Sequence, residues 1–166
     1  MVNAAKFFGY NFKGRDEDNN IIVELKNTQD DLIVGENARR MYQLLNVIEF
    51  NSTRKRMSVI VRSRQDDSIR VMCKGADSII IPLLKKGQDK DIKKTSEFLD
   101  SFSKEGLRTL VIAEKYISPE EYSAWNKEYQ RALVETKDRE EKVMAVSEQI
   151  ERGFTLVGTT AIEDKL

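Results

Sequence analysis

The chain has 166 residues, 40% of them apolar and 34% charged, which fits one soluble globular domain large enough for a real core. Lysine plus arginine and aspartate plus glutamate number 28 each, and this zero net charge argues against a dedicated binder of nucleic acid or of membrane surfaces. Because the chain has no histidine and one cysteine, Cys73, histidine-based catalysis, an internal disulfide and a cysteine-rich zinc cluster are excluded.

The first half of the chain is predicted to consist mainly of strands. A short helix is expected at residues 2–8, where alanine and phenylalanine recur. After it, apolar runs bounded by polar turns predict strands, because half-buried strands alternate apolar and polar residues and fully buried strands are short apolar runs. These strands are expected at residues 12–15, 21–26, 41–50, 57–64 and 68–74.

The second half is predicted to contain three helices around a strand. Residues 89–104 carry apolar side chains on one helical face. Residues 108–116 are almost continuously apolar, which is typical of a strand covered on both faces. A capping box begins at Ser118 and a second one at Asp138, and the helix after the second box is expected to end at Gly153. The last two helices should form a hairpin lying on the sheet.

A last strand is expected at residues 154–160. Strands in antiparallel order with helices grouped between them indicate an α+β fold, an antiparallel β-sheet flanked by helical hairpins. We expect an excised domain, with residues 1–159 forming the domain and residues 160–166 beginning a linker that leaves it.

Cations gather in one segment of this neutral chain. Their excess favours a bound anion, either phosphate groups or nucleic acid, although an exposed hairpin edge also carries cations that discourage aggregation. Phe50, at the start of the segment, could stack on a purine or be the last core residue of its strand. Between Phe50 and Arg64 there is no acidic residue, and the basic ones are Arg54, Lys55, Arg56, Arg62 and Arg64.

A tetrad from Lys74 to Asp77 joins a predicted strand to a predicted helix. Lys74 ends the strand, so its ammonium can project over the edge of the sheet. Gly75 and Ala76 carry almost no side chain, so a ligand ring could approach the backbone there. Asp77 would then cap the helix. An ordinary strand–turn–helix connection uses the same residues.

Arg108 lies two residues after Gly106, at the start of a strand. A guanidinium binds phosphate with two hydrogen bonds, and the alternative partner is a local carboxylate such as Glu105. One aromatic ring, two lysines and one arginine on three separate segments suit a nucleoside triphosphate, with stacking for the base and cations for the phosphates.

These segments, in this order, resemble the nucleotide-binding (N) domain of a P-type ATPase. The resemblance covers essentially the whole chain and rests on residues 50–59, 74–77, 105–113 and 158–166. Within the family, the chain resembles the type IV subclass, the phospholipid flippases. This narrower resemblance rests on Asp77, where cation pumps have proline, and on the final stretch from Ala161 to Leu166.

The resemblance implies a role for each residue of the site. Phe50 would stack on adenine, and Met57 would pack beneath the base. Lys55 and Lys74 would line the adenine and ribose side and attract the phosphates, while Arg108 would reach the polyphosphate. ATP would be bound with Mg²⁺ carried by the nucleotide. The resulting cofactor-binding set, without a catalytic residue or a metal ligand, is Phe50, Lys55, Met57, Lys74, Gly75, Ala76 and Arg108.

In that family, an aspartate in an Asp-Lys-Thr-Gly-Thr motif accepts the terminal phosphoryl group of ATP, and the cycle is coupled to lipid flipping. The chain lacks this motif, so we expect it to bind ATP without turnover. The resemblance implies a monomeric cytosolic domain of an integral membrane protein. Its partners would be the phosphorylation and actuator domains of the same protein and not nucleic acid.

Two other interpretations stay open at this stage. One is the N domain of a cation-transporting P-type ATPase. The other, from a different class, is a non-enzymatic domain that docks nucleic acid or a protein partner through the basic segment 54–64.

Overall fold

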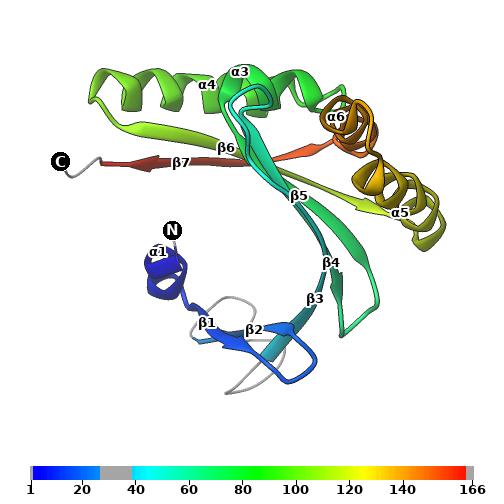
Figure 1. Ribbon diagram of the computed structural model, residues 1–166. Coiled ribbons are helices and arrows are strands. Elements are labelled where there is room, and N and C mark those ends of the chain that lie inside the picture. The colour runs from blue at the N-terminus through cyan, green and yellow to red at the C-terminus, as the bar shows by residue number, and fades with distance from the viewer. Residues whose placement is uncertain (1, 27–38, 164–166) are drawn as a thin grey trace.

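A computed structural model describes residues 2–26 and 39–163 of the chain. Within them, seven strands form one antiparallel sheet whose strand order is the order along the chain (Figure 1). The strands are β1 (Tyr10–Arg15), β2 (Asn20–Leu25), β3 (Arg39–Ile48), β4 (Arg56–Ser63), β5 (Ile69–Gly75), β6 (Arg108–Ile117) and β7 (Thr155–Ile162).

The sheet is strongly curled, and the helices divide between its two sides (Figure 1). Register shifts in the pairings of β1 with β2, β3 with β4 and β6 with β7 mark bulges, which increase the bend and twist of a sheet. One helix, α1 (Val2–Phe7), lies on the concave side. The convex side carries α3 (Asp77–Ile80), a 3₁₀ turn at Ile81–Leu83, α4 (Asp89–Lys104), α5 (Pro119–Val134) and α6 (Arg139–Ile150).

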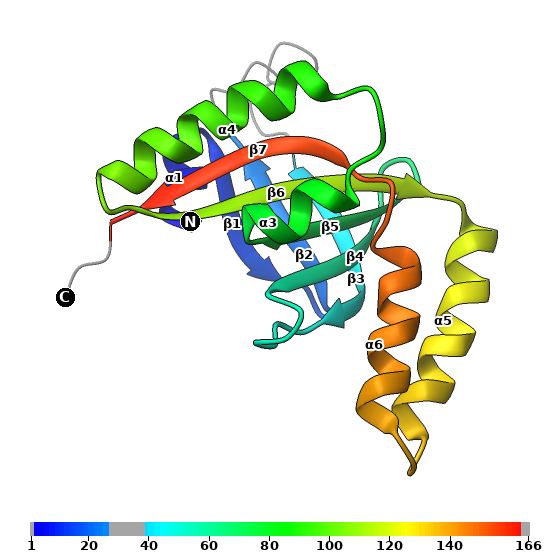
Figure 2. The same ribbon diagram turned by 90° about the horizontal axis from the view of Figure 1, so that it is seen from above.

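The hydrophobic core lies between the convex face and these helices. Alternate residues of the central strands, such as Ile60, Val71 and Ala113, are fully buried in it. Trp125 and Tyr129 of α5 belong to this core, and their rings are stacked with their centroids 4.8 Å apart. The α5–α6 hairpin projects from one end of the sheet (Figure 2), and the Trp125 indole donates to the Val146 carbonyl at 2.8 Å across it.

The α+β class and the antiparallel sheet with flanking helices are confirmed. The capping box at Ser118 is also confirmed, because its side chain accepts from the Glu121 amide at 3.1 Å. The capping box predicted at Asp138 is wrong, because its side-chain hydrogen bond does not form. Asp138 precedes α6 in the left-handed region, with φ of 55°, and its side chain makes no cap hydrogen bond.

Three predicted details of the second half differ from the structure. The helix α6 ends at Ile150, three residues before Gly153. The strand β6 is fully buried on one face only: Val111 lies beneath the helices, whereas Ile112 is half-buried on the concave face that they leave open. The strand β7 continues to Ile162, into the predicted linker, whose last residues, 164–166, lie outside the described residues.

No helix in the described ranges is both long and apolar enough to span a lipid bilayer.

Candidate functional site

The topology brings the three candidate segments to one end of the sheet. In an antiparallel meander, the end of one strand lies beside the start of the next. The ends of β3 and β5 therefore lie at the same end of the sheet as the starts of β4 and β6. Phe50 follows β3, Lys74 is the penultimate residue of β5, and Arg108 begins β6.

A row of side chains crosses the concave face near this end. Met57 pairs with Lys74, and Lys74 pairs with Ile112, so the three side chains lie on one face. All three are half-buried. Their neighbours of opposite parity, Cys73 and Ala113, belong to the core under the helices. An ammonium flanked by apolar groups on an open face can bind a ligand that is part ring and part anion.

Arg108 lies on the same face of β6 as Ile112, four residues earlier and therefore about 13 Å along the strand. Its position is fixed by the end of α4. The Gly106 amide donates to the Ser103 carbonyl and the Leu107 amide to the Phe102 carbonyl, both at 3.0 Å, with Gly106 at φ of 74°. This is a Schellman motif, and it turns the chain from the helix directly into β6.

Gly75 lies in the predicted place but has a different role from the one expected. It pairs with Arg56 and faces the convex side, where a Cβ atom would meet the Lys55 carbonyl oxygen at 2.7 Å and the Arg56 Cβ atom at 2.8 Å. The missing side chain therefore admits the neighbouring strand and not a ligand ring. Beside it, the Ala76 amide donates to the same Lys55 carbonyl at 3.3 Å, so the tetrad and the basic segment touch directly.

The expected cap of the following helix is absent. The N-cap of α3 is Ala76, with φ and ψ of −63° and 145°, and no side chain accepts a cap hydrogen bond there. Asp77 is the first helical residue instead. Its carboxylate lies in the first turn, where negative charge is favoured by the helix dipole.

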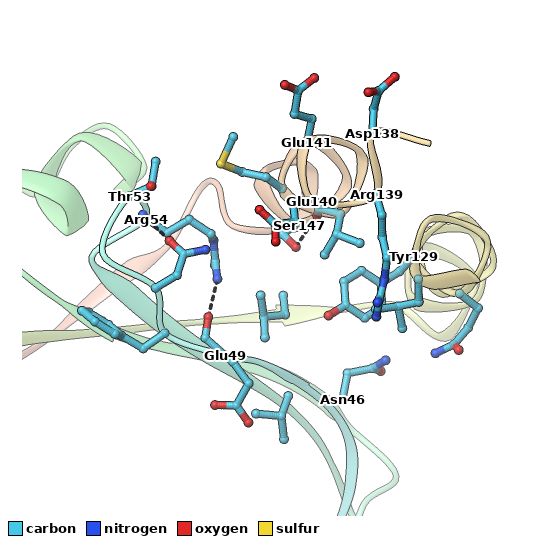
Figure 3. Close-up of a pocket in the computed structure, with 18 of the residues that line it drawn as sticks. Asn46, Glu49, Thr53, Arg54, Tyr129, Asp138, Arg139, Glu140, Glu141 and Ser147 are labelled. Atoms are coloured by element: carbon cyan, nitrogen blue, oxygen red, sulfur yellow. Dashed lines mark hydrogen bonds between the residues drawn. The ribbon is translucent and has the colours of Figure 1, made fainter. Parts of the chain in front are cut away.

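Phe50 is not the last core residue of its strand. Its side chain is 61% exposed, in the loop between β3 and β4. The same loop lines a hollow of about 1200 Å³ between β3 and the α5–α6 hairpin, on the convex side, and Tyr129 and Arg139 line its other wall (Figure 3). This hollow is lined by neither Lys74 nor Arg108.

A second hollow, of about 350 Å³, lies on the concave side beneath α1. Its walls are almost entirely apolar and include Val2, Val23 and Met72. Lys55, Lys74 and Arg108 do not line it either. The candidate cations thus lie on an open surface at the end of the sheet and not in either hollow.

Sequence reasoning missed a buried ionic cluster that holds the loop. Glu151, which follows α6 and has no exposed surface, accepts hydrogen bonds from Arg54 and Arg56, which are 4% and 7% exposed. The Arg56 Nε–Glu151 Oε2 distance is 2.7 Å, and the Ser58 hydroxyl donates to Glu151 Oε1 at 2.5 Å. In the sequence, the sign of this cluster is that Arg54 and Arg56 are two residues apart and so lie on the same face of the chain. Nothing in the sequence indicates that Glu151 is their partner.

This cluster changes the interpretation of the basic segment. Arg54 and Arg56 are buried and paired with Glu151. The Arg62 Nε atom lies 3.7 Å from Asp67 Oδ1. Arg64 donates to the Asn20 side chain at 3.0 Å. Segment 54–64 is therefore not a continuous exposed cationic patch, and the docking interpretation loses the observation on which it depended.

The described residues include no cluster of three or more acidic, cysteine or histidine side chains that could hold a metal ion. A metal that enters with a nucleotide needs no such cluster, because the phosphates supply its oxygen ligands. The Cys73 thiol, one residue before Lys74, is buried, and this burial raises its pKa to about 11. It is therefore a packed core group and not a nucleophile.

Comparison with known proteins gives one consistent result. A family model described as the cytoplasmic domain N of P-type ATPases matches residues 4–166. The chain is 51% identical over 126 residues to phospholipid-transporting ATPase DNF1 of Chaetomium thermophilum, which covers 75% of the chain and 8% of that protein.

Two further relatives match along the whole chain. It is 41% identical to phospholipid-transporting ATPase 10 of Arabidopsis thaliana and 40% identical to phospholipid-transporting ATPase IC of Mus musculus. The match covers 13% and 12% of those proteins, so the chain spans only about an eighth of their length.

Proposed function

The chain belongs to the cytoplasmic N domains of P-type ATPases, and from this premise we propose that it is the ATP-binding domain of a phospholipid-translocating ATPase. The subclass is supported by the names of the three relatives described above, each of which is a phospholipid-transporting ATPase. The observation that carries the proposal is the convergence of three segments at one end of the sheet, with Lys74 between Met57 and Ile112 on an open face.

ATP would lie across this end of the concave face. The adenine ring would pack over Met57 and against the exposed ring of Phe50, which base–aromatic stacking favours by about 1–3 kcal/mol. Lys55 is exposed and Lys74 half-exposed, and neither makes an ion pair within the described ranges, so both can attract phosphates. Arg108, about 13 Å further along the face, would reach the polyphosphate.

Gly75 and Ala76 would act indirectly in this proposal. Gly75 admits the Lys55 carbonyl, and Ala76 donates to it, so both hold the lysine loop against the end of β5. Mg²⁺ would enter with the nucleotide and would neutralise charge on the phosphates. Acidic residues of the described chain would not be its main ligands.

The complete protein would transfer the terminal phosphoryl group to an aspartate in another domain and couple that cycle to lipid movement. The chain has no such motif, so its own part would be to hold ATP and present it. We propose phosphorylation and actuator domains as its partners. We propose that the domain extends to the end of β7 at Ile162, three residues beyond the expected boundary at 159, and that it lies on the cytosolic side of a membrane protein.

The test is a titration of the chain with Mg²⁺–ATP, followed by amide NMR shifts. The expected dissociation constant is on the order of 1 mM, or about −4 kcal/mol, because an open face encloses the nucleotide only partly. Shifts should centre on Phe50, Lys74 and Arg108. Their absence at saturating ATP would reject the proposal.

A matched pair of variants separates stacking from general loss of an aromatic ring. Phe50→Ala should weaken ATP binding at least about fivefold, since it removes a stacking platform. Phe98→Ala removes a ring that is also exposed, 49% against 61%, from α4 on the convex side, and should leave the affinity unchanged. Equal effects of the two substitutions would argue against adenine stacking on Phe50.

A further inference from the structure

The loop between β3 and β4 is tied to a distant part of the chain by one carboxylate. Both oxygens of Glu151 are used: Oε1 accepts from Arg54 and from Ser58, and Oε2 accepts from Arg56. The three donors lie about 95 residues earlier in the chain, and Glu151 itself follows the last turn of α6. The carboxylate therefore joins the helical hairpin to the start of β4.

The loop is also closed internally around Arg54. The Arg54 guanidinium donates to the Glu49 carbonyl at 2.8 Å, and its amide donates to the Asn51 side chain at 2.7 Å (Figure 3). The Lys55 amide donates to the Asn51 carbonyl at 2.9 Å, and the Lys55 backbone has a φ of 49°. The residues that flank Phe50 thus depend on where the Arg54 guanidinium is held.

The cluster also determines which way Lys55 points. Arg54 and Arg56 turn inward to Glu151, and Lys55 between them is exposed. Its left-handed backbone, unusual for a residue with a side chain, directs its carbonyl to Ala76 at 3.3 Å. Without Glu151, no single group of the described chain holds both arginines, because Arg56 is left with a 4.0 Å contact to Glu148 and a 3.4 Å hydrogen bond to the Arg54 carbonyl.

We propose that Glu151 is a positioning residue for the nucleotide site. It does not touch the ligand. Through Arg54 and Arg56 it sets the arrangement of Phe50 and Lys55 before ATP arrives, so that binding does not have to order the loop. This inference rests on the proposed ATP site, and it adds a residue that lies outside the four segments on which the resemblance to the family was based.

The test compares two destabilised variants, because loss of stability alone does not distinguish positioning from structure. Glu151→Gln keeps the shape of the side chain and removes its charge. Leu99→Ala creates a cavity under α4, in the same core but outside the cluster. Both are studied at a temperature where each is folded, by amide spectra without nucleotide and by titration with Mg²⁺–ATP.

The expected result is that Glu151→Gln shifts or broadens the amide signals of residues 50–55 without nucleotide and weakens ATP binding at least about fivefold, since preorganisation is lost. Leu99→Ala should do neither. Unchanged loop signals in Glu151→Gln, or equal losses of affinity in both variants, would overturn the proposal.

Two further outcomes are covered by this design. If Glu151→Gln does not fold, Ser58→Ala removes one donor to the same carboxylate and should move the same loop signals by a smaller amount. If the unmodified chain does not bind ATP, the proposed function fails, while the loop signals still report whether Glu151 holds Phe50 and Lys55 in place.

Discussion

Arg54, Lys55 and Arg56 are consecutive cations with opposite surroundings. The two arginines are buried and paired with Glu151, whereas Lys55 is exposed and makes no ion pair in the part of the chain described here. Lys74, on the neighbouring strand, has no ion pair there either. A run of positive charge can therefore divide between two roles, with some residues holding a loop and others left exposed to a ligand.

The largest expected effect separates the two kinds of cation by stability. Arg54→Ala should lower the free energy of unfolding by about 3–5 kcal/mol, because it leaves a buried carboxylate partly unpaired. Lys55→Ala, next to it, should change it by no more than about 0.5 kcal/mol, as surface substitutions usually do. Urea denaturation measures both, and similar values for the two variants would contradict the division.

The next effect concerns the contact between the two segments. Gly75→Ala should cost about 1–3 kcal/mol, because the added Cβ atom would lie 2.7 Å from the Lys55 carbonyl oxygen and 2.8 Å from the Arg56 Cβ atom. Neither atom is at the flexible end of a side chain, so the clash cannot be relieved by a change of rotamer. It should also shift the Lys55 amide signal. The control is Ala113→Gly, on the next strand, which removes a methyl group without a clash. A neutral Gly75→Ala would show that β4 and β5 can separate freely at this end.

The smallest expected effect is on binding alone. Lys74→Ala should weaken ATP about tenfold, or about 1.4 kcal/mol, with little change in stability, because this lysine is half-exposed and unpaired within the described ranges. Lys93→Ala, on the exposed surface of α4, provides the control for general charge. A loss of stability in Lys74→Ala as large as in Arg54→Ala would remove the contrast between the two groups.

Much of the fold could be predicted because its signals are local. Alternating apolar residues identified β4 and β5 within one or two residues, and Ser118 with Glu121 marked the start of α5. The turns that join β1 to β2, β3 to β4 and β4 to β5 are short, as antiparallel neighbours allow, whereas helices separate β5 from β6 and β6 from β7. The buried face of β6 could not be found this way, since its apolar run is the same whether helices cover one side or both.

The sequence indicated which segments meet at one end of the sheet, but not which of their residues pack inside and which stay exposed. The role of Gly75 depends on its pairing with Arg56, and therefore on register, which sequence spacing alone does not determine. The partner of Arg54 and Arg56 lies about 95 residues away, at the end of a helix whose other charges face solvent. The capping box predicted at Asp138 does not form because the Asp138 backbone lies in the left-handed region. The spacing of Asp138 and Glu141 in the sequence does not reveal that conformation.

The burial of Cys73 has a consequence for kinetics. A thiol with a pKa of about 11 is almost entirely protonated at pH 8, and the Cys73 side chain lies in the core under the helices. A thiol reagent can therefore modify it only when this part of the core opens. Because the chain has a single cysteine, the rate at which Cys73 is modified measures how often the structure opens there, one residue from Lys74. ATP bound beside it should lower this rate of modification.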